Sequence, residues 1–452
     1  MGVTICNAVI RRHKNRFTFP IMIKIDNVRS LQAFQIMRFG AVILVNILLA
    51  KSSLGLEEIG IYETLIFLGT GISFFWVSGL LKGMLTTYPN LSEVERREFF
   101  VNVFLVFCGM STLVVSVFFL FKNTVIQGLT NYETLPHYNL LCFYVLLNTP
   151  TYLVEYIYLL TNQPRKIVGF GLYAFGLHVA AIILPIMLGF GIAGSLYGLI
   201  CLAVTKFIWV LILLAQYGRF RINWTILRPY LWLSFPLMLN ILVAGGAEYI
   251  DGVIIHQFFD SEAFAIFRYG AREFPLALAM TTAFSSAMIP RVAENLQAGL
   301  TEIKAQSQGF TRWLFWIAII LMFTAPVLFP IVFNPDFKDS ALIFNIYLLL
   351  LISRVLFPQT ILIGLKKTGF ILWVSLIELV INVVLSLILV QTMGLIGVAV
   401  ATVIAFACEK IMMISYNYFQ LKIPLNAYLN VRMYLMYSGL LVGSFLLSLW
   451  LT

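Results

Sequence analysis

Residues 168–190 read VGFGLYAFGLHVAAIILPIMLGF, a run with no aspartate, glutamate, lysine or arginine. About 20 apolar residues are enough for a helix to cross the hydrocarbon core of a bilayer. A second apolar run follows at once, opening with Gly-Ile-Ala-Gly at 191–194 and ending near residue 216. This part of the chain therefore predicts two consecutive membrane-spanning helices.

The rest of the chain has the same character. Of its 452 residues 61% are hydrophobic and only 11% are charged, whereas about a quarter of an ordinary soluble domain is charged. The apolar runs leave only short connections, so there is no room for a soluble catalytic or nucleotide-binding domain. We expect an all-α polytopic membrane protein with thirteen spans, at about 31–50, 59–81, 99–121, 137–160, 168–190, 192–216, 229–258, 261–289, 312–333, 341–364, 369–391, 394–418 and 432–451.

The basic residues of the connections predict the orientation. If the spans alternate, the N-terminal side holds 21 lysines and arginines, and the other side holds only Lys51, Lys122 and Lys338. Cytoplasmic loops collect these residues, so we expect a cytoplasmic N-terminus and, in residues 1–30, a basic cytoplasmic tail without a cleaved signal. Translation starting at Met22 is the alternative to Met1. The net charge of +10 then reflects topology, and no nucleic-acid partner is expected.

Two motifs recur at nearly the same spacing. Gly-Leu-Ile-Gly at 394–397 repeats the motif of 191–194, and FDSEAFAIF at 259–267 repeats LGLEEIGIY at 54–62, with offsets of 203 and 205 residues. Duplicated six-helix halves enter the membrane from the same side, as in alternating-access carriers. Coincidence between apolar segments is the alternative. We expect an N-terminal lobe at 31–217, a cytoplasmic linker at 218–228, a C-terminal lobe at 229–420 and an additional span within 421–452.

Several segments in order resemble the multidrug/oligosaccharidyl-lipid/polysaccharide exporter superfamily, which is MATE-like, and most closely its Wzx-type polysaccharide flippases. The resemblance implies a V-shaped carrier made of two six-helix bundles. Two features depart from the family pattern: Gly252 follows Asp251 where a basic residue is usual, and the thirteenth span is unusual. The matching segments are ILLAK at 47–51 with LG at 54–55 and IGIY at 59–62, SFPL at 234–237, AFSSAMIPR at 283–291 and GLIGVA at 394–399.

The same resemblance implies a function. The protein would move a polyprenyl-pyrophosphate-linked oligosaccharide, such as an O-antigen unit, from the cytoplasmic to the outer leaflet of a bacterial inner membrane, beside polysaccharide assembly proteins. No GxxxxGK[ST] motif is present, so H⁺, Na⁺ or the membrane potential would drive transport. No cofactor and no catalysis are expected. The alternatives are a cation-coupled multidrug exporter, a peptidoglycan-precursor flippase and, less in keeping with the short outer loops, a polytopic glycosyltransferase or polymerase.

Charges inside spans are costly and point to function. Glu248 and Asp251 precede the turn near residue 260 by 12 and 9 residues, and Arg268 and Arg272 follow it by 8 and 12. Since a helix rises 1.5 Å per residue, each acid shares a depth with one arginine. We therefore predict a two-rung ladder, Glu248 with Arg272 and Asp251 with Arg268. It is either a switchable site for pyrophosphate or a coupling cation, or permanent interhelical pairing.

Arg38 and Arg354 have no acid at matching depth in their own hairpins. Each is expected to face a watery cleft, where a guanidinium suits phosphate, or to find a partner elsewhere. Glu155 and Glu378 are candidates for H⁺ or Na⁺ coupling, or for bonds to a neighbouring helix. No metal site is expected, because the histidines lack ligand spacing. Three further charges are expected to extend toward the cytoplasmic surface: Lys206, Glu409 and Lys410.

Overall fold

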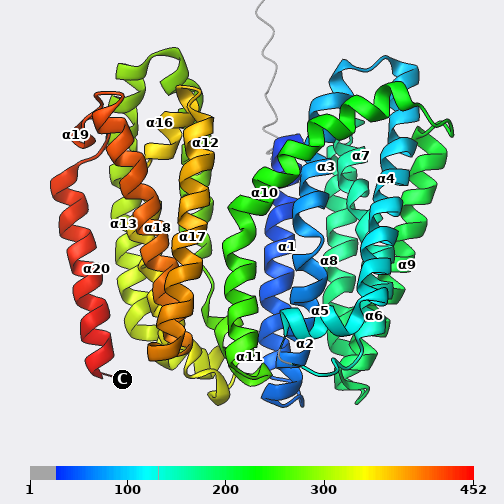
Figure 1. The fold of residues 1–452 in the computed structure, drawn as a ribbon, viewed down its shortest axis with the longest axis horizontal. Helices are drawn as coiled ribbons and strands as arrows, with labels where there is room; N and C mark the ends of the chain where they lie inside the picture. Colours follow the sequence, from blue (N-terminus) through cyan, green and yellow to red (C-terminus); the bar gives the residue numbers. More distant parts are fainter. Residues whose placement is uncertain (1–26, 131, 452) are drawn as a thin grey trace, which may run out of the picture.

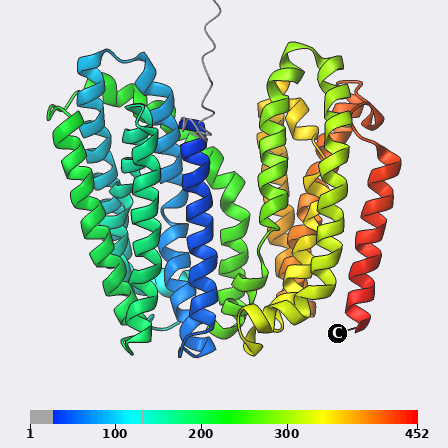
Figure 2. The ribbon, with the colours of Figure 1, turned by 180° about the vertical axis from the view of Figure 1, so that it is seen from behind.

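The computed structural model describes residues 27–130 and 132–451, which form helices and no strand. The expected N-terminal tail lies outside these residues apart from 27–30, and so do both candidate start sites. The helices form two bundles standing side by side, seen from opposite directions in Figures 1 and 2. The predicted all-α membrane class is therefore confirmed.

The N-terminal half supplies the bundle on the right of Figure 1. Its elements are α1 (Asn27–Ala50), α2 (Leu56–Gly71), α3 (Phe74–Thr87), η1 (Tyr88–Asn90), α4 (Glu93–Leu120), α5 (Lys122–Leu129), α6 (Tyr138–Asn148), η2 (Thr149–Tyr152), α7 (Leu153–Leu160), α8 (Pro164–Met187) and α9 (Gly191–Tyr217).

The second half begins with α10, which runs down between the bundles, and continues into the bundle on the left. Its elements are α10 (Trp224–Phe258), α11 (Ser261–Gly270), α12 (Pro275–Glu294), α13 (Leu296–Val332), η3 (Pro335–Phe337), α14 (Ser340–Leu348), α15 (Leu350–Arg354), α16 (Pro358–Gly364), α17 (Thr368–Met393), α18 (Leu395–Phe419), α19 (Leu425–Tyr428) and α20 (Val431–Leu451).

The helices account for the predicted spans one for one. Within the described residues, eleven helical segments are long and apolar enough to cross a membrane, and two bent pairs raise the total to thirteen. The bent pairs are α2 with α3, at 41°, and α14–α15 with α16, at 45°. α1 begins at one end of the molecule and α20 finishes at the other, as an odd number of crossings requires (Figure 1).

Local sequence explains where α4 begins. Ser92 has extended backbone angles and its hydroxyl accepts a hydrogen bond from the Glu95 amide, while the Glu95 carboxylate accepts one from the Ser92 amide at 2.9 Å. This reciprocal capping box satisfies two amide groups that have no partner within the helix. The chain therefore turns into the membrane immediately after the loop that follows α3.

Close packing holds α10 against α3. Gly79 and Gly83 form a GxxxG pair on α3, and a Cβ atom at residue 79 would lie 2.8 Å from the Met238 Cα. A Cβ atom at residue 83 would meet Ser234 in the same way. Small residues let membrane helices approach closely, where dispersion and packing replace the hydrophobic effect. The first part of α10 therefore packs against the N-terminal bundle.

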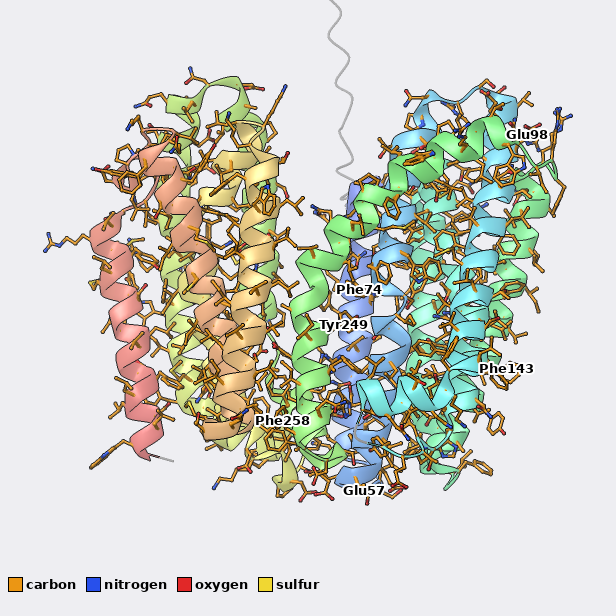
Figure 3. The ribbon with its side chains drawn as sticks, viewed as in Figure 1. Glu57, Phe74, Glu98, Phe143, Tyr249 and Phe258 are labelled. Atoms are coloured by element: carbon orange, nitrogen blue, oxygen red, sulfur yellow. The ribbon has the colours of Figure 1, made fainter. Side chains whose placement is uncertain are left out.

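Aromatic contacts continue this interface toward the middle of α10. The rings of Phe74 on α3 and Tyr249 on α10 stack with centroids 4.4 Å apart (Figure 3). Gly252 lies next to Asp251 on the same helix, and a Cβ atom there would meet the Phe67 ring at 2.5 Å. This contact explains why a small residue stands where the family pattern has a basic one. The same helix also packs on α17, so α10 contacts both bundles.

The α3–α10 interface predicts the effect of a single methyl group. Gly79→Ala places a Cβ atom against the Met238 backbone, which cannot move aside as a flexible side chain would. Overpacking of this kind costs about 1–3 kcal/mol, so the unfolding midpoint of the purified protein should fall. Gly109→Ala is the matched helical control, because nothing lies within 4 Å of a Cβ atom there. Equal midpoints for the two variants would contradict the proposed packing.

Candidate functional site

The two bundles meet where α2 and α11 lie side by side, at the bottom of Figure 1. A Cβ atom on Gly60 would lie 2.8 Å from the Ser261 Cβ, so only glycine permits this approach. The Asn334 amide also donates to the Ala50 carbonyl oxygen at 2.8 Å, and the contact thus extends to the end of α1. These bonds join the halves of the chain at one end of the molecule.

Charged groups from α11 take part in this contact. The Arg268 Nε lies 3.8 Å from a carboxylate oxygen of Glu63 on α2, so this ion pair links the two bundles. Arg272 donates to the Arg268 carbonyl oxygen at 3.2 Å. It also donates to Asn46 on α1 when that amide is oriented so that both of its ends are satisfied. Arg268 and Arg272 therefore contact the opposite bundle.

Asp251 does not pair with Arg268, so this rung of the predicted ladder is wrong for the conformation described. The carboxylate is 2% exposed and accepts hydrogen bonds from Thr402 on α18 at 2.7 Å and from Ser386 on α17 at 3.4 Å. The side chains of Asp251 and Arg268 contact different neighbours, on α17 and α18 for Asp251 and on α2 for Arg268. The other rung, Glu248 with Arg272, is not tested, because the side chain of Glu248 is outside the described part.

The surroundings of Asp251 consist of oxygen-bearing groups. Asn382 donates to the Thr402 hydroxyl at 3.2 Å, and its buried Oδ1 has no hydrogen-bond partner among the described residues. Thr402 and Ser386 add two hydroxyl groups. A carboxylate, hydroxyls and an unpaired amide oxygen are the ligands that a hard cation prefers. The structure thus places Asp251 beside Thr402, Ser386 and Asn382, which the sequence pattern did not link to it.

In four spans the α-helix is interrupted part-way along, and these spans occupy matching places in the two halves. The second and eighth spans break between α2 and α3 and between α11 and α12. The fourth and tenth break at η2 and between α15 and α16. Breaks in corresponding segments of duplicated carriers mark binding sites, because they free backbone polar groups inside the membrane.

An ion pair joins two of these breaks. Glu273 lies in the break of the eighth span, and Arg354 is the last residue of α15 before the break of the tenth. The Arg354 Nε donates to one Glu273 oxygen at 2.9 Å, and a terminal nitrogen of the guanidinium donates to the other. The guanidinium also lies 4.8 Å from the Phe406 ring centroid. Of the two expectations for Arg354, a distant acid partner is therefore the one observed.

Glu378 belongs to the same region of the C-terminal bundle. It is buried, its Oε1 has no hydrogen-bond partner among the described residues, and it interacts electrostatically with Glu409, Lys410 and Arg354. The Lys410 ammonium donates to the Glu409 carboxylate at 2.8 Å, and both side chains are buried. The expectation that Glu409 and Lys410 extend to the membrane surface is wrong, because they pair with each other inside the bundle.

Arg38 has a different environment in the N-terminal bundle. Its side chain is exposed, and no hydrogen bond or ion pair joins it to another described residue. It acts electrostatically on the buried Glu155 of α7 and on Lys206 of α9. Lys206 donates to the side-chain oxygen of Asn148, so it too is directed inward and not toward the surface as expected.

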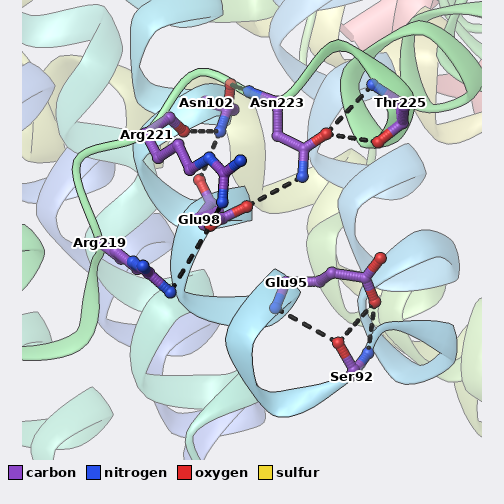
Figure 4. A network of polar contacts seen from close by, with 8 residues as sticks. All are labelled: Ser92, Glu95, Glu98, Asn102, Arg219, Arg221, Asn223 and Thr225. Carbon is purple, nitrogen blue, oxygen red and sulfur yellow. Dashed lines mark hydrogen bonds and ion pairs between the residues drawn. The ribbon is translucent and has the colours of Figure 1, made fainter.

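Sequence reasoning missed Glu98, the centre of the network in Figure 4. This carboxylate is 1% exposed, accepts a hydrogen bond from Asn223 at 2.9 Å, and lies 3.7 Å from Arg221 and 3.9 Å from Arg219. Asn102 adds bonds to the same segment, which is the linker between the halves. The sequence signal that could have revealed this network was the pair of linker arginines, Arg219 and Arg221. These arginines were counted only as evidence for the orientation in the membrane.

Comparisons with solved structures agree with this geometry. The chain resembles the lipid II flippase MurJ in an inward closed conformation, with a TM-score of 0.68 and 18% identity over 92% of this chain and 95% of that one. It resembles an inward-facing multidrug resistance MATE family transporter of the MOP superfamily, with a TM-score of 0.65 and 14% identity over 88% and 98%. An outward-facing transporter of that family gives 0.59, at 16% identity over 88% and 96%.

The chain thus has the fold of these multi-pass membrane proteins. A family model described as "polysaccharide biosynthesis protein" matches residues 54–342, which is more than half of the chain. The chain belongs to this polysaccharide biosynthesis family. No curated protein matches the sequence.

The Glu98 network predicts how the linker is held. Glu98→Gln removes the charge that attracts Arg219 and Arg221, whose side chains are already exposed, so the linker backbone should detach more often and enter the trypsin active site more readily. We expect faster tryptic cleavage at these residues in the detergent-solubilised protein. Glu93→Gln is the control, since Glu93 is exposed on the same helix. Unchanged cleavage in the Glu98 variant would show that the network does not restrain the linker.

Proposed function

We propose that the protein is a flippase for a lipid-linked oligosaccharide. Its cargo would be a polyprenyl-pyrophosphate-linked sugar, such as an O-antigen or other surface polysaccharide unit. Membership in the polysaccharide biosynthesis family over residues 54–342 is the observation that carries the proposal. The likeness to a lipid II flippase agrees with a lipid-linked cargo.

The proposed location is the bacterial inner membrane, with the N-terminus in the cytoplasm. The 21-to-3 distribution of basic residues between the two sides supports this orientation. The bundles are in contact at the end away from the start of α1, and the fold matches an inward-facing transporter better than an outward-facing one. The end joined by α2 and α11 is then the outer gate, closed in this conformation.

Alternating access would follow from breaking and remaking this gate. The Glu63–Arg268 ion pair and the bonds to Asn46 and Ala50 cross between the bundles, so outward opening requires their separation. Sugars and pyrophosphate would cross between the bundles while the polyprenyl chain stays in lipid. An anionic cargo leaving a negative cell interior gains about 2.3 kcal/mol per charge per 100 mV. Polysaccharide assembly proteins would supply and receive the cargo.

Flipping can be measured in proteoliposomes with a fluorescently labelled polyprenyl-pyrophosphate sugar and an external quencher. Wild-type protein should move the probe between leaflets. Arg38→Gln should slow flipping about tenfold or more, because Arg38 is proposed to contact the pyrophosphate and a charged hydrogen bond contributes about 1.5–3 kcal/mol. Arg38→Lys should retain part of the rate.

The controls separate the proposal from its alternatives. Lys51→Gln, at an exposed position on the opposite side, should flip at the wild-type rate. Failure of the wild-type protein to flip the probe, combined with export of hydrophobic cations, would favour a multidrug exporter. Flipping of lipid II alone would favour the peptidoglycan-precursor alternative.

We also propose that Asp251 binds the coupling cation, H⁺ or Na⁺. Asp251, Ser386, Asn382 and Thr402 would hold the ion, and a bound cation would supply a positive charge that no described side chain gives to this buried carboxylate. These residues come from α10, α17 and α18, so occupancy would change how the shared helix α10 sits against the C-terminal bundle.

Neutralising Asp251 tests the coupling proposal. Asp251→Asn should remove the dependence of flipping on an imposed Na⁺ or H⁺ gradient, since the amide neither carries a charge nor takes up a proton. Asp339→Asn, at an exposed position near the closed end, should keep the gradient response. A gradient response unchanged in Asp251→Asn would assign coupling elsewhere, with Glu155 and Glu378 as the next residues to neutralise.

A further inference from the structure

The break of the fourth span is repeated in the tenth. Asn148 is the last residue of α6 before one break, and Arg354 is the last residue of α15 before the other, 206 residues later. Each half also has a lysine on its sixth span. These are Lys206 on α9 and Lys410 on α18, which are 204 residues apart. These spacings agree with the offsets of the other repeated motifs. The two halves therefore carry polar side chains at corresponding positions, and we call each set a copy of one polar arrangement.

The copy in the C-terminal half is neutralised by acids. Glu273 pairs with Arg354, and Glu409 pairs with Lys410. Glu378 lies within electrostatic range of both cations. Three carboxylates thus face two cations, so this copy has no need of a further anion.

The copy in the N-terminal half lacks these acids. Thr205 occupies the place that Glu409 has beside Lys410, and its hydroxyl donates to the Leu202 carbonyl oxygen at 2.8 Å. Lys206 donates to Asn148, an uncharged amide, and makes no ion pair with any described acid. The Lys206 side chain is half-buried, and partial burial of an ammonium group without an opposite charge is still costly.

A second cation lies in the same electrostatic environment. Arg38 on α1 lies within electrostatic range of Lys206 on α9 and of Glu155 on α7. Among these three groups, two are cations and one is an acid. A planar guanidinium binds phosphate oxygens in pairs, and an ammonium binds them as a point charge. A ligand with two adjacent phosphates matches one group of each kind.

We propose that Lys206 is a second substrate-binding cation, which binds the pyrophosphate of the cargo together with Arg38 in the N-terminal bundle. This inference rests on the proposed function and adds a specific residue and a specific lobe to it. Asn148 is a positioning residue, because its amide oxygen directs the ammonium without cancelling its charge. The pyrophosphate then binds at Lys206 in the N-terminal half. The corresponding residues of the C-terminal half, Arg354 and Lys410, stay paired with Glu273 and Glu409.

The test is the affinity for inorganic pyrophosphate and for a short-chain prenyl pyrophosphate, measured by calorimetry on the full-length protein in lipid nanodiscs. Lys206→Gln should weaken binding about 10-fold to 100-fold, the range for a lost charged hydrogen bond. Lys206→Arg should bind within a few-fold of wild type. The double variant Glu409→Gln/Lys410→Gln is the matched control from the other copy and should bind as wild type does.

Asn148→Asp provides a second test that keeps Lys206 in place. The new carboxylate would neutralise the ammonium, so pyrophosphate binding should weaken as in Lys206→Gln, while the unfolding midpoint should stay the same or rise. Wild-type affinity in both Lys206→Gln and Asn148→Asp would overturn the proposal for Lys206 and leave the flippase intact. No binding of either probe by wild-type protein would overturn the substrate class itself, and this inference with it.

Discussion

Every polar side chain inside a bilayer must find a partner, because lipid offers none. This constraint orders the interior of the protein. Two ion pairs satisfy it, Glu273 with Arg354 and Glu409 with Lys410. The carboxylate of Asp251 satisfies it with hydrogen bonds from the hydroxyls of Ser386 and Thr402. Arg38 forms no ion pair with a described acid, and we propose that the cargo supplies its partner.

The spans could be predicted from sequence because hydropathy is a local property. All thirteen predicted spans correspond to helices or bent helix pairs, and the repeat of Gly191–Gly194 at Gly394–Gly397 marks the openings of α9 and α18. The breaks within four spans were not predicted. Pro150 and Pro358 lie at two of them, but proline in a membrane helix gives either a bend or a break, and packing decides between the two.

The partners of the charges could be predicted only in part. Residue counting predicts a depth for Asp251 and for Arg268, but it does not give the direction in which each side chain points around its helix. That direction depends on α17 and α18, which pack on α10 from more than a hundred residues further along the chain. The partner of Arg354 was missed for the same reason, since Glu273 belongs to another hairpin.

Helix α10 packs on both bundles, and this affects the order in which the protein can assemble. The groove of Gly79 and Gly83 on α3 is filled by α10, which the ribosome completes only after all six preceding spans and the linker. The α3 surface around these two glycines therefore has no α10 to pack against until the second half is made. Domains usually fold as units in the order of synthesis, but here the first is completed only by the opening helix of the second. Completion of the first bundle therefore coincides with the joining of the two halves.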